Sequence, residues 1–271
     1  MRRRPVLRRT PWPLALLGVV GAAVFVVPLI ALVVRAPWSS ADDLVRSPAV
    51  REALWLSMTT SVTATVVSVV LGVPLAFLLA RGHLPGRGVI RAVCTLSMVL
   101  PPVVAGVALF LALGRRGLIG GLLDEWFGVR LPFTTPAVVI AQVFVAMPFL
   151  VLTVDAAIVA VDERREDVAR TLGASEWYVF RRVLMPTVRP AILAGSVLTW
   201  ARALGEFGAT ITFAGSLPGV TRTMPLETYL ALEVDLERAV LVSLVLVAIS
   251  FAVLVALRGR WVGAVAGGRR L

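Results

Sequence analysis

Two oppositely charged residues stand four positions apart inside a long apolar segment of this 271-residue chain. They are Arg202 and Glu206, and on a helix they would share one face and could form an ion pair. A charge inside a membrane-spanning helix costs about 2.5–3.5 kcal/mol on insertion scales, so such residues are functional candidates by default. Three roles are open: a structural pair, an arginine facing a passing anion, and a pair across an interface between two copies.

The chain lacks most of the residues that enzymes use for chemistry. Its 27 basic side chains are all arginine, and it has one histidine, His83, and one cysteine, Cys94. Without lysine it can hold neither an ordinary Walker A phosphate loop nor a lysine Schiff base. A single cysteine forms no disulfide within the chain, and one His with one Cys is too few for a metal site of the usual kind. We therefore expect a non-catalytic chain that binds no cofactor itself.

The composition is typical of a membrane protein. Hydrophobic residues make up 58% of the chain and charged residues only 16%, against about 25% in typical globular proteins. The apolar residues gather in runs long enough to cross a bilayer, which takes about 20 residues of helix. The predicted fold class is an all-α integral membrane protein with six transmembrane helices, at residues 14–34, 53–80, 89–113, 136–160, 190–213 and 239–257.

Arginines are distributed unevenly between the two ends of these predicted helices. The opposite loops hold eight, whereas 18 lie in the N-terminal segment 1–13, the connection 81–91, the stretch 162–189 and the tail 258–271. Because cytoplasmic loops of membrane proteins carry excess Arg, both termini and the stretch 162–186 are predicted to be cytoplasmic. The net charge of +11 is explained by this topology, without any binding to nucleic acid.

The charged and aromatic stretch 162–186 predicts two short helices that meet at a corner. Asp162 can cap the first helix, Gly173 tolerates the positive φ of a helix stop, and Ser175 can cap a second helix that Pro186 would end. A helix lying on lipid headgroups would explain the arginines and the tryptophan of this stretch, but not its acidic cluster or its glycine corner. Docking into a groove on a soluble partner fits the mixed charge better, and both alternatives stay open from the residues alone.

The spacing of this stretch resembles the cytoplasmic loop of permease subunits from binding-protein-dependent ABC importers. That loop has the form Glu-Ala-Ala, three residues, Gly, nine residues, Ile, one residue, Leu-Pro. Three positions of the chain match outright and four are conservative replacements. The resemblance implies a coupling helix in a cleft of an ATP-hydrolysing subunit. The residues that it assigns to ATPase coupling are Asp167, Val168, Ala169, Gly173, Ala174, Trp177, Phe180, Val183, Met185 and Pro186.

A second segment resembles the molybdate permease branch of this family. The branch signature is Arg-x-x-Gly-Glu-Phe-Gly-Ala-Thr, then Phe-Ala-Gly, then Thr-x-Thr-x-Pro-Leu, and it is met at 202–210, 213–215 and 221–226. The segment "VLPPVVAGVALF" at 99–110 is also similar, and the resemblance covers nearly the whole chain from about residue 50. It implies import of a tetrahedral oxyanion across the membrane of a bacterial-type cell. Molybdate is the first expectation, and sulfate and tungstate are alternatives.

The resemblance also implies partners and a domain organisation. The partners are a second permease copy in a homodimer, a cytoplasmic ABC ATPase dimer that uses ATP and Mg, an extracytoplasmic substrate-binding protein and the lipid bilayer. The expected domains are a basic cytoplasmic N-terminus (1–13), a six-helix permease domain (14–257) and a basic cytoplasmic tail (258–271). A secondary anion transporter or channel is the competing class. Such proteins often show inverted repeats with paired broken helices, and we see no internal repeat in the sequence.

The adjacent prolines 101 and 102 fall near the middle of the third predicted span. They remove two backbone donors, and in lipid such a break survives only against protein or a water-filled cavity. The break is either a kink packed against neighbouring helices or a bend that lines a pathway. Asp155, near the end of the fourth span, is expected to reach the interface and is given no role. The expected translocation-path residues are Pro101, Pro102, Arg202, Glu206 and Thr210.

Overall fold

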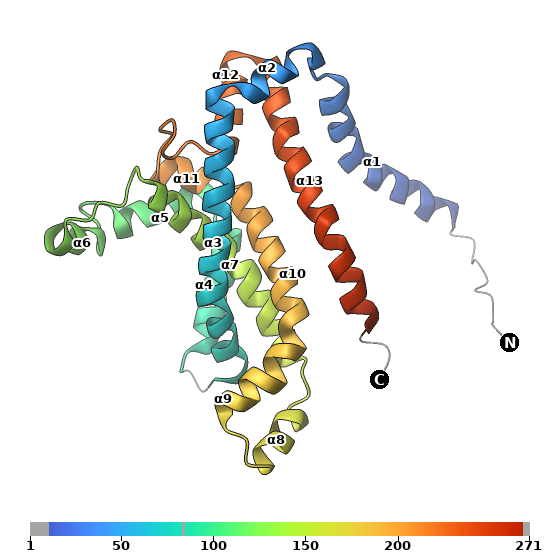
Figure 1. Cartoon of the computed structure of the whole chain (residues 1–271), viewed down its shortest axis with the longest axis vertical. Coiled ribbons are helices and arrows are strands. Elements are labelled where there is room, and N and C mark those ends of the chain that lie inside the picture. Colours follow the sequence, from blue (N-terminus) through green and yellow to red (C-terminus); the bar gives the residue numbers. More distant parts are fainter. Residues whose placement is uncertain (1–10, 83–84, 268–271) are drawn as a thin grey trace.

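The computed structural model describes residues 11–82 and 85–267, and within them the backbone forms helices joined by short loops (Figure 1). His83 and the arginines at positions 2, 3, 4, 8, 9, 269 and 270 lie outside the described residues. Five described helices are long and apolar enough to cross a membrane: α1 (Trp12–Val34), α3 (Pro48–Arg81), α7 (Thr135–Val159), the continuous helix Glu176–Leu204 and α13 (Leu236–Gly267). The prediction of an all-helical membrane protein is confirmed.

The centre of the bundle is formed by α3, α7 and α10 (Met185–Leu204), which pack against one another. Their apolar core includes Leu79, Leu150 and Leu184, all fully buried. Gly195 permits the close approach of α10 to α7, since a Cβ added there would lie 2.9 Å from Cδ1 of Leu150. Small residues at helix contacts are the usual means of packing helices in lipid, where no hydrophobic force drives them together.

The third predicted span, 89–113, is interrupted at Pro101 and Pro102, and the break predicted there is confirmed. The chain forms α4 (Arg87–Val99) and α5 (Pro102–Leu113), with an extended backbone at Leu100 and Pro101 between them. The two prolines cause the break because neither can donate the backbone hydrogen bond that would continue α4. Beyond the break, α5 and then α6 (Gly120–Phe127) extend sideways from the bundle (Figure 1).

The bounds of the fifth predicted span, 190–213, are wrong. The helix ends at Leu204, and after a short break the chain forms a separate helix, α11 (Gly208–Phe213). Gly205 and Gly208 border this break, and glycine is a poor helix former, so hydropathy alone did not reveal it.

The same helix also begins earlier than predicted. It runs from Glu176 through a π-helical turn, Phe180–Leu184, into α10, so Pro186 does not end the second helix of the stretch 162–186. A proline in the first turn of a helix needs no N–H partner. Here it follows a π turn in which the Met185 N–H bonds to the Phe180 carbonyl.

The two ends of the bundle carry different short elements. One end carries α2 (Ala41–Arg46) and α12 (Met224–Val234), and the opposite end carries α8 (Arg164–Thr171) and α9 (Glu176–Val179) (Figure 1). None of the residues of α1, all of which the structure describes, is buried, and this helix lies outside the bundle beside α13.

Candidate functional site

The stretch 162–186 begins with two short helices that meet at a corner, α8 and α9. Oδ1 of Asp162 accepts a hydrogen bond from the Arg164 N–H (3.0 Å), and Oγ of Ser175 accepts one from the Tyr178 N–H (3.3 Å). Gly173 lies between the helices with φ of +83°, a conformation that glycine adopts without steric cost. The Ser175 cap and the glycine corner are therefore confirmed, whereas Glu163 and not Asp162 occupies the N-cap position of α8.

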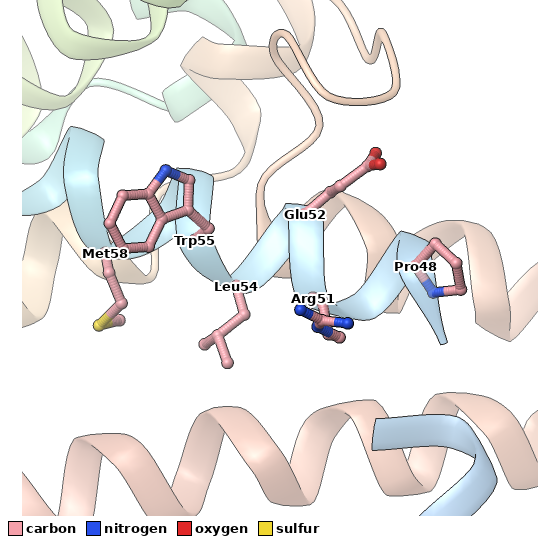
Figure 2. Close-up of a pocket in the computed structure, with 6 residues that line it drawn as sticks. All are labelled: Pro48, Arg51, Glu52, Leu54, Trp55 and Met58. Atoms are coloured by element: carbon pink, nitrogen blue, oxygen red, sulfur yellow. The ribbon is translucent and has the colours of Figure 1, made fainter. Parts of the chain in front are cut away.

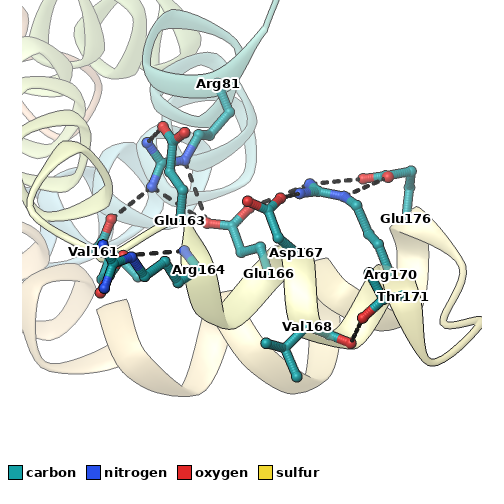
Figure 3. A network of polar contacts seen from close by, with 11 residues as sticks. Arg81, Val161, Glu163, Arg164, Glu166, Asp167, Val168, Arg170, Thr171 and Glu176 are labelled. Atoms are coloured by element: carbon teal, nitrogen blue, oxygen red, sulfur yellow. Dashed lines mark hydrogen bonds and ion pairs between the residues drawn. The ribbon is translucent and has the colours of Figure 1, made fainter.

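Arg170 ties the two helices together across this corner (Figure 3). Its guanidinium contacts Asp167 (2.9 Å) and Glu166 (3.4 Å) on α8 and Glu176 (2.8 Å) on α9. Hydrogen bonding to Glu176 is the main cause that raises the pKa of Arg170 above its ordinary value. One arginine thus holds three carboxylates and fixes the angle between α8 and α9.

A second arginine attaches α8 to the end of α3. Arg81, the last residue of α3, donates to the Val161 carbonyl (2.8 Å) and forms ion pairs with Glu163 and Glu166 (Figure 3). The carboxylate of Glu166 is buried between Arg81 and Arg170. The acidic cluster therefore holds the corner on the bundle and does not face solvent as a whole.

Apolar side chains remain exposed on the outside of this element. The exposed fractions are 58% for Val168, 82% for Leu172 and 67% for Trp177. The Trp177 ring stacks on Phe180 at 5.5 Å between centroids, and Phe180 contacts Phe77 of α3 edge to face at 5.1 Å. Large apolar side chains exposed next to paired charges are typical of an interaction surface.

The predicted coupling residues divide into two groups. The residues from Asp167 to Trp177 surround the corner, whereas Phe180, Val183, Met185 and Pro186 lie in the π turn and the first turn of α10. A pocket of about 1120 Å³ lies between the corner and the end of α3, with Phe77, Arg81, Glu166, Trp177 and Phe180 among its lining residues. The corner is therefore a distinct element that projects beyond the helical bundle (Figure 1).

Arg202 and Glu206 form an ion pair at the end of α10, with 2.7 Å between Nη1 and Oε2. Oε1 of Glu206 also accepts a hydrogen bond from the Ala209 N–H (2.9 Å), in the first turn of α11. Glu206 is 1% exposed, so its two carboxylate oxygens contact protein groups and not solvent. Of the three roles open from the sequence, the structural pair is the one that this geometry supports. Thr210 is fully buried beside this pair.

The proline break lies against the break that follows Leu204. A Cβ added at Gly208 would lie 2.6 Å from Cβ of Pro102, and one added at Gly106 would lie 2.6 Å from Cβ of Thr212. The two interrupted helices thus meet at their interruptions, which the sequence analysis did not foresee. Because of this contact, the expected path residues lie in one region: Pro101 and Pro102 are exposed, whereas Glu206 and Thr210 are buried.

An ion pair near the α8 end of the bundle was not predicted from the sequence. Asp155 is buried and paired with Arg91 of α4, so the expectation that it reaches the interface is wrong. The roles of Arg81, Glu163 and Glu166 were also missed. Arginines and acids at the ends of the predicted helices could have indicated ion pairs between helices. The paired residues lie 64 to 85 positions apart, so the sequence alone did not identify the partners.

A further pocket, of about 680 Å³, lies on the first turns of α3, at the end opposite to α8 (Figure 2). Apolar Leu54, Trp55 and Met58 line it together with Arg51 and Glu52, whose side chains point to opposite sides of the helix. A mixed charged and apolar surface therefore exists at this end as well.

Comparisons with known proteins agree with these features. The profile of the family described as "Binding-protein-dependent transport system inner membrane component" matches residues 50–266. The chain is 45% identical to the molybdenum transport system permease protein ModB of Mycobacterium bovis over 245 residues, which are 90% of this chain and 92% of that protein. It is 36% identical to the sulfate transport system permease protein CysW of Escherichia coli, over 77% of this chain and 72% of that one.

Solved structures show the same fold at low sequence identity. A chain of a bacterial ABC transporter involved in the import of the acidic polysaccharide alginate superposes with a TM-score of 0.76 at 16% identity, over 92% of this chain and 94% of that one. A chain of the MetNI methionine ABC transporter superposes with a TM-score of 0.61 at 15% identity, over 80% and 96%. By the match over residues 50–266 and the identity to its relatives, this chain belongs to the family of inner membrane components of binding-protein-dependent transport systems.

Proposed function

We propose that this chain is the permease subunit of an ATP-driven importer and that its cargo is molybdate. The observation that carries the proposal is the 45% identity to a molybdenum permease over nine-tenths of both chains. Identity to a sulfate permease is lower, 36% over a smaller share of both chains. Sulfate and tungstate are tetrahedral dianions of the same class and remain the alternative cargoes.

The proposed topology has six crossings, with α4 and α5 together forming the third. The basic N-terminus (1–13), the tail (258–271) and the corner at 162–186 lie on the cytoplasmic side of the membrane domain (14–257). Two observations support this: arginine is in excess at these segments, and α13 runs towards the end of the bundle that carries α8, while α1 runs the opposite way (Figure 1).

The α8–α9 corner is the proposed coupling element, which docks into a cleft of a cytoplasmic ATPase dimer. Its charges are largely used in holding the corner together, whereas Val168, Leu172 and Trp177 are left exposed for a partner. A groove on a soluble subunit can bury such a face of a short helix. The ATPase supplies ATP and Mg chemistry that this lysine-free chain does not carry.

The proposed assembly contains two copies of this permease around one central path, and an extracytoplasmic binding protein delivers the anion. A dianion needs an aqueous route, since charged groups enter hydrocarbon only at high cost. We propose that the region where the two interrupted helices meet contributes to the wall of this path through the exposed Pro101 and Pro102, while the buried Thr210 supports the wall from inside the protein. Arg202 and Glu206 support that wall, because their ion pair and the bond to α11 hold the break in place.

The test is uptake by the reconstituted transporter. Permease, ATPase and receptor are placed in liposomes, and radiolabelled molybdate uptake is measured with ATP, with a non-hydrolysable analogue and without nucleotide. Uptake should require hydrolysable ATP and the receptor. Uptake that persists without ATP, driven by an ion gradient alone, would instead support a secondary transporter. Competition with tungstate and sulfate in the same assay assigns the cargo, and preferred uptake of sulfate would refute the molybdate assignment.

A further inference from the structure

A bidentate ion pair joins α4 to α7 close to the candidate coupling element. Nε of Arg91 donates to Oδ2 of Asp155 (3.0 Å), and Nη2 donates to Oδ1 (2.9 Å). Nη2 also donates to the Leu79 carbonyl of α3 (3.4 Å). The side chain of Asp155 is 8% exposed. The guanidinium of Arg91 therefore links three helices, α3, α4 and α7, at a single point.

This link is important because the apolar attachment of α4 to the bundle is limited to one face. Among its residues, all of them described, only Ser97 is buried. Ile90 and Cys94 pack partly against the core of α3 and α7, while Val89 and Val93 are exposed. Since only a few apolar side chains of α4 pack against the bundle, the ion pair is the main polar link between α4 and α7. The far end of α4 leads directly into the Pro101–Pro102 break.

A second arginine, Arg81, links the neighbouring end of α3 to α8. Arg81 joins the end of α3 to α8 through Glu163 and Glu166, and α8 follows α7 in the chain after a short turn. Two arginines thus join the ends of α3, α4 and α7 to the first turn of α8. The opposite end of α4 lies at the break whose Pro102 packs against Gly208, beside Glu206.

We propose that Arg91 and Asp155 are positioning residues for transport, which make α4 move together with α7. A displacement of α8 by the ATPase then reaches the Pro101–Pro102 break instead of being lost in a loosely held helix. The proposal rests on the proposed function, because it assumes that α8 is the element on which the ATPase acts. Packed elements joined by charge pairs are the kind of network through which such coupling passes.

The experiment measures molybdate uptake and ATP hydrolysis in the same reconstituted full transporter, and compares their ratio. Asp155→Asn keeps the volume of the side chain but removes its charge, and Arg91→Gln removes the guanidinium. Both variants should retain ATP hydrolysis within about twofold while the uptake-to-hydrolysis ratio falls about 5-fold or more. Arg91→Lys keeps the charge but not the bidentate geometry, so its ratio should lie between those of Arg91→Gln and the wild type.

A matched control lies at α6, on the side of the bundle and away from α8 (Figure 1). Asp124 of α6 forms ion pairs with Arg115 and Arg130, which flank this helix, both at 2.8 Å. Asp124→Asn makes the same chemical change as Asp155→Asn but should leave the uptake-to-hydrolysis ratio at the wild-type value.

The outcomes separate this inference from the function on which it rests. A wild-type ratio in both Asp155→Asn and Arg91→Gln would overturn the inference alone. So would a proportional loss of uptake and hydrolysis, because that would show a role in stability or assembly only. A wild-type transporter without ATP-driven uptake would instead refute the proposed function, and the inference with it.

Discussion

Pro102 and Gly208 are in direct contact, so close that a Cβ added to Gly208 would lie 2.6 Å from Cβ of Pro102 and 3.2 Å from the Val103 nitrogen. Each residue begins the helix that follows an interruption, Pro102 in α5 and Gly208 in α11. The residues at one helix break thus pack directly against the residues at the other. Backbone groups released at depth in the membrane are tolerated where protein covers them, which explains why the two breaks occur together.

Replacing Gly208 with alanine should destabilise the permease, because the added methyl group overlaps a rigid proline ring and backbone. Overpacking of this kind costs about 1–3 kcal/mol. Gly205→Ala is the control, since its added Cβ would only reach the Ala201 carbonyl at 3.7 Å. The measurement is the thermal unfolding temperature of the purified permease in detergent. Equal temperatures for the two variants would contradict the close contact.

Gly173→Val should uncouple ATP hydrolysis from uptake. Its φ of +83° is unfavourable for any residue with a Cβ by about 1–2 kcal/mol, and β-branched residues fit this region worst. No atom lies within 4 Å of the added Cβ, so the effect comes from the backbone and not from a clash. Gly173→Asn should behave almost as the wild type, because asparagine tolerates this conformation. Full coupling in the valine variant would count against the corner as a docking element.

Arg81→Ala should loosen α8 from the end of α3. The loss of its hydrogen bonds to Glu166 and the Val161 carbonyl makes local opening of α8 easier by about 1.5–3 kcal/mol, the usual range for bonds to charged groups. The measurement is the rate of trypsin cleavage at the arginines of α8, which should rise. Arg46→Ala is the control, because the Arg46–Asp42 pair is exposed and such pairs contribute little. An unchanged cleavage rate would mean that Arg81 does not hold the corner.

The single variant Arg202→Ala should be less stable than the double variant Arg202→Gln/Glu206→Gln. The single change leaves the carboxylate of Glu206, 1% exposed, without its partner, which costs about 3 kcal/mol, whereas the double change leaves no buried charge. Thermal unfolding gives the stabilities and vesicle uptake gives the activity. If the pair is structural, the double variant recovers uptake along with stability. A stable double variant without uptake would assign Arg202 to the anion path.

The segment 115–130, which contains α6, should lose stability at low pH because Asp124 becomes protonated. Hydrogen bonds from Arg130 and then Arg115 hold the pKa of Asp124 below its ordinary value of 3.8. A lowered pKa in the folded state means that the stabilisation is complete above the ordinary pKa and is lost as the pH falls below it. Carboxyl ¹³C NMR with labelled aspartate, assigned by Asp124→Asn, should show a titration midpoint below 3.8 that rises in Arg130→Ala. A midpoint that Arg130→Ala leaves unchanged would contradict this.

The sequence by itself determined the features that depend on neighbouring residues. Apolar runs gave the membrane class and most of the long helices, because a backbone in lipid must satisfy its hydrogen bonds within a helix. Gly173 and Ser175 marked the α8–α9 corner through positive φ and capping, and the four-residue spacing of Arg202 and Glu206 gave their ion pair.

Only the tertiary structure decided which of these elements lie together. Asp155 was expected at the membrane surface, but it is buried against Arg91, 64 positions away, and Glu166 lies between Arg81 and Arg170. The contact of Pro102 with Gly208 joins two breaks about a hundred residues apart, and only one of those breaks was foreseen. Periodicity and hydropathy describe each helix separately, whereas these contacts depend on which helices are neighbours, and that is set by packing over the whole bundle.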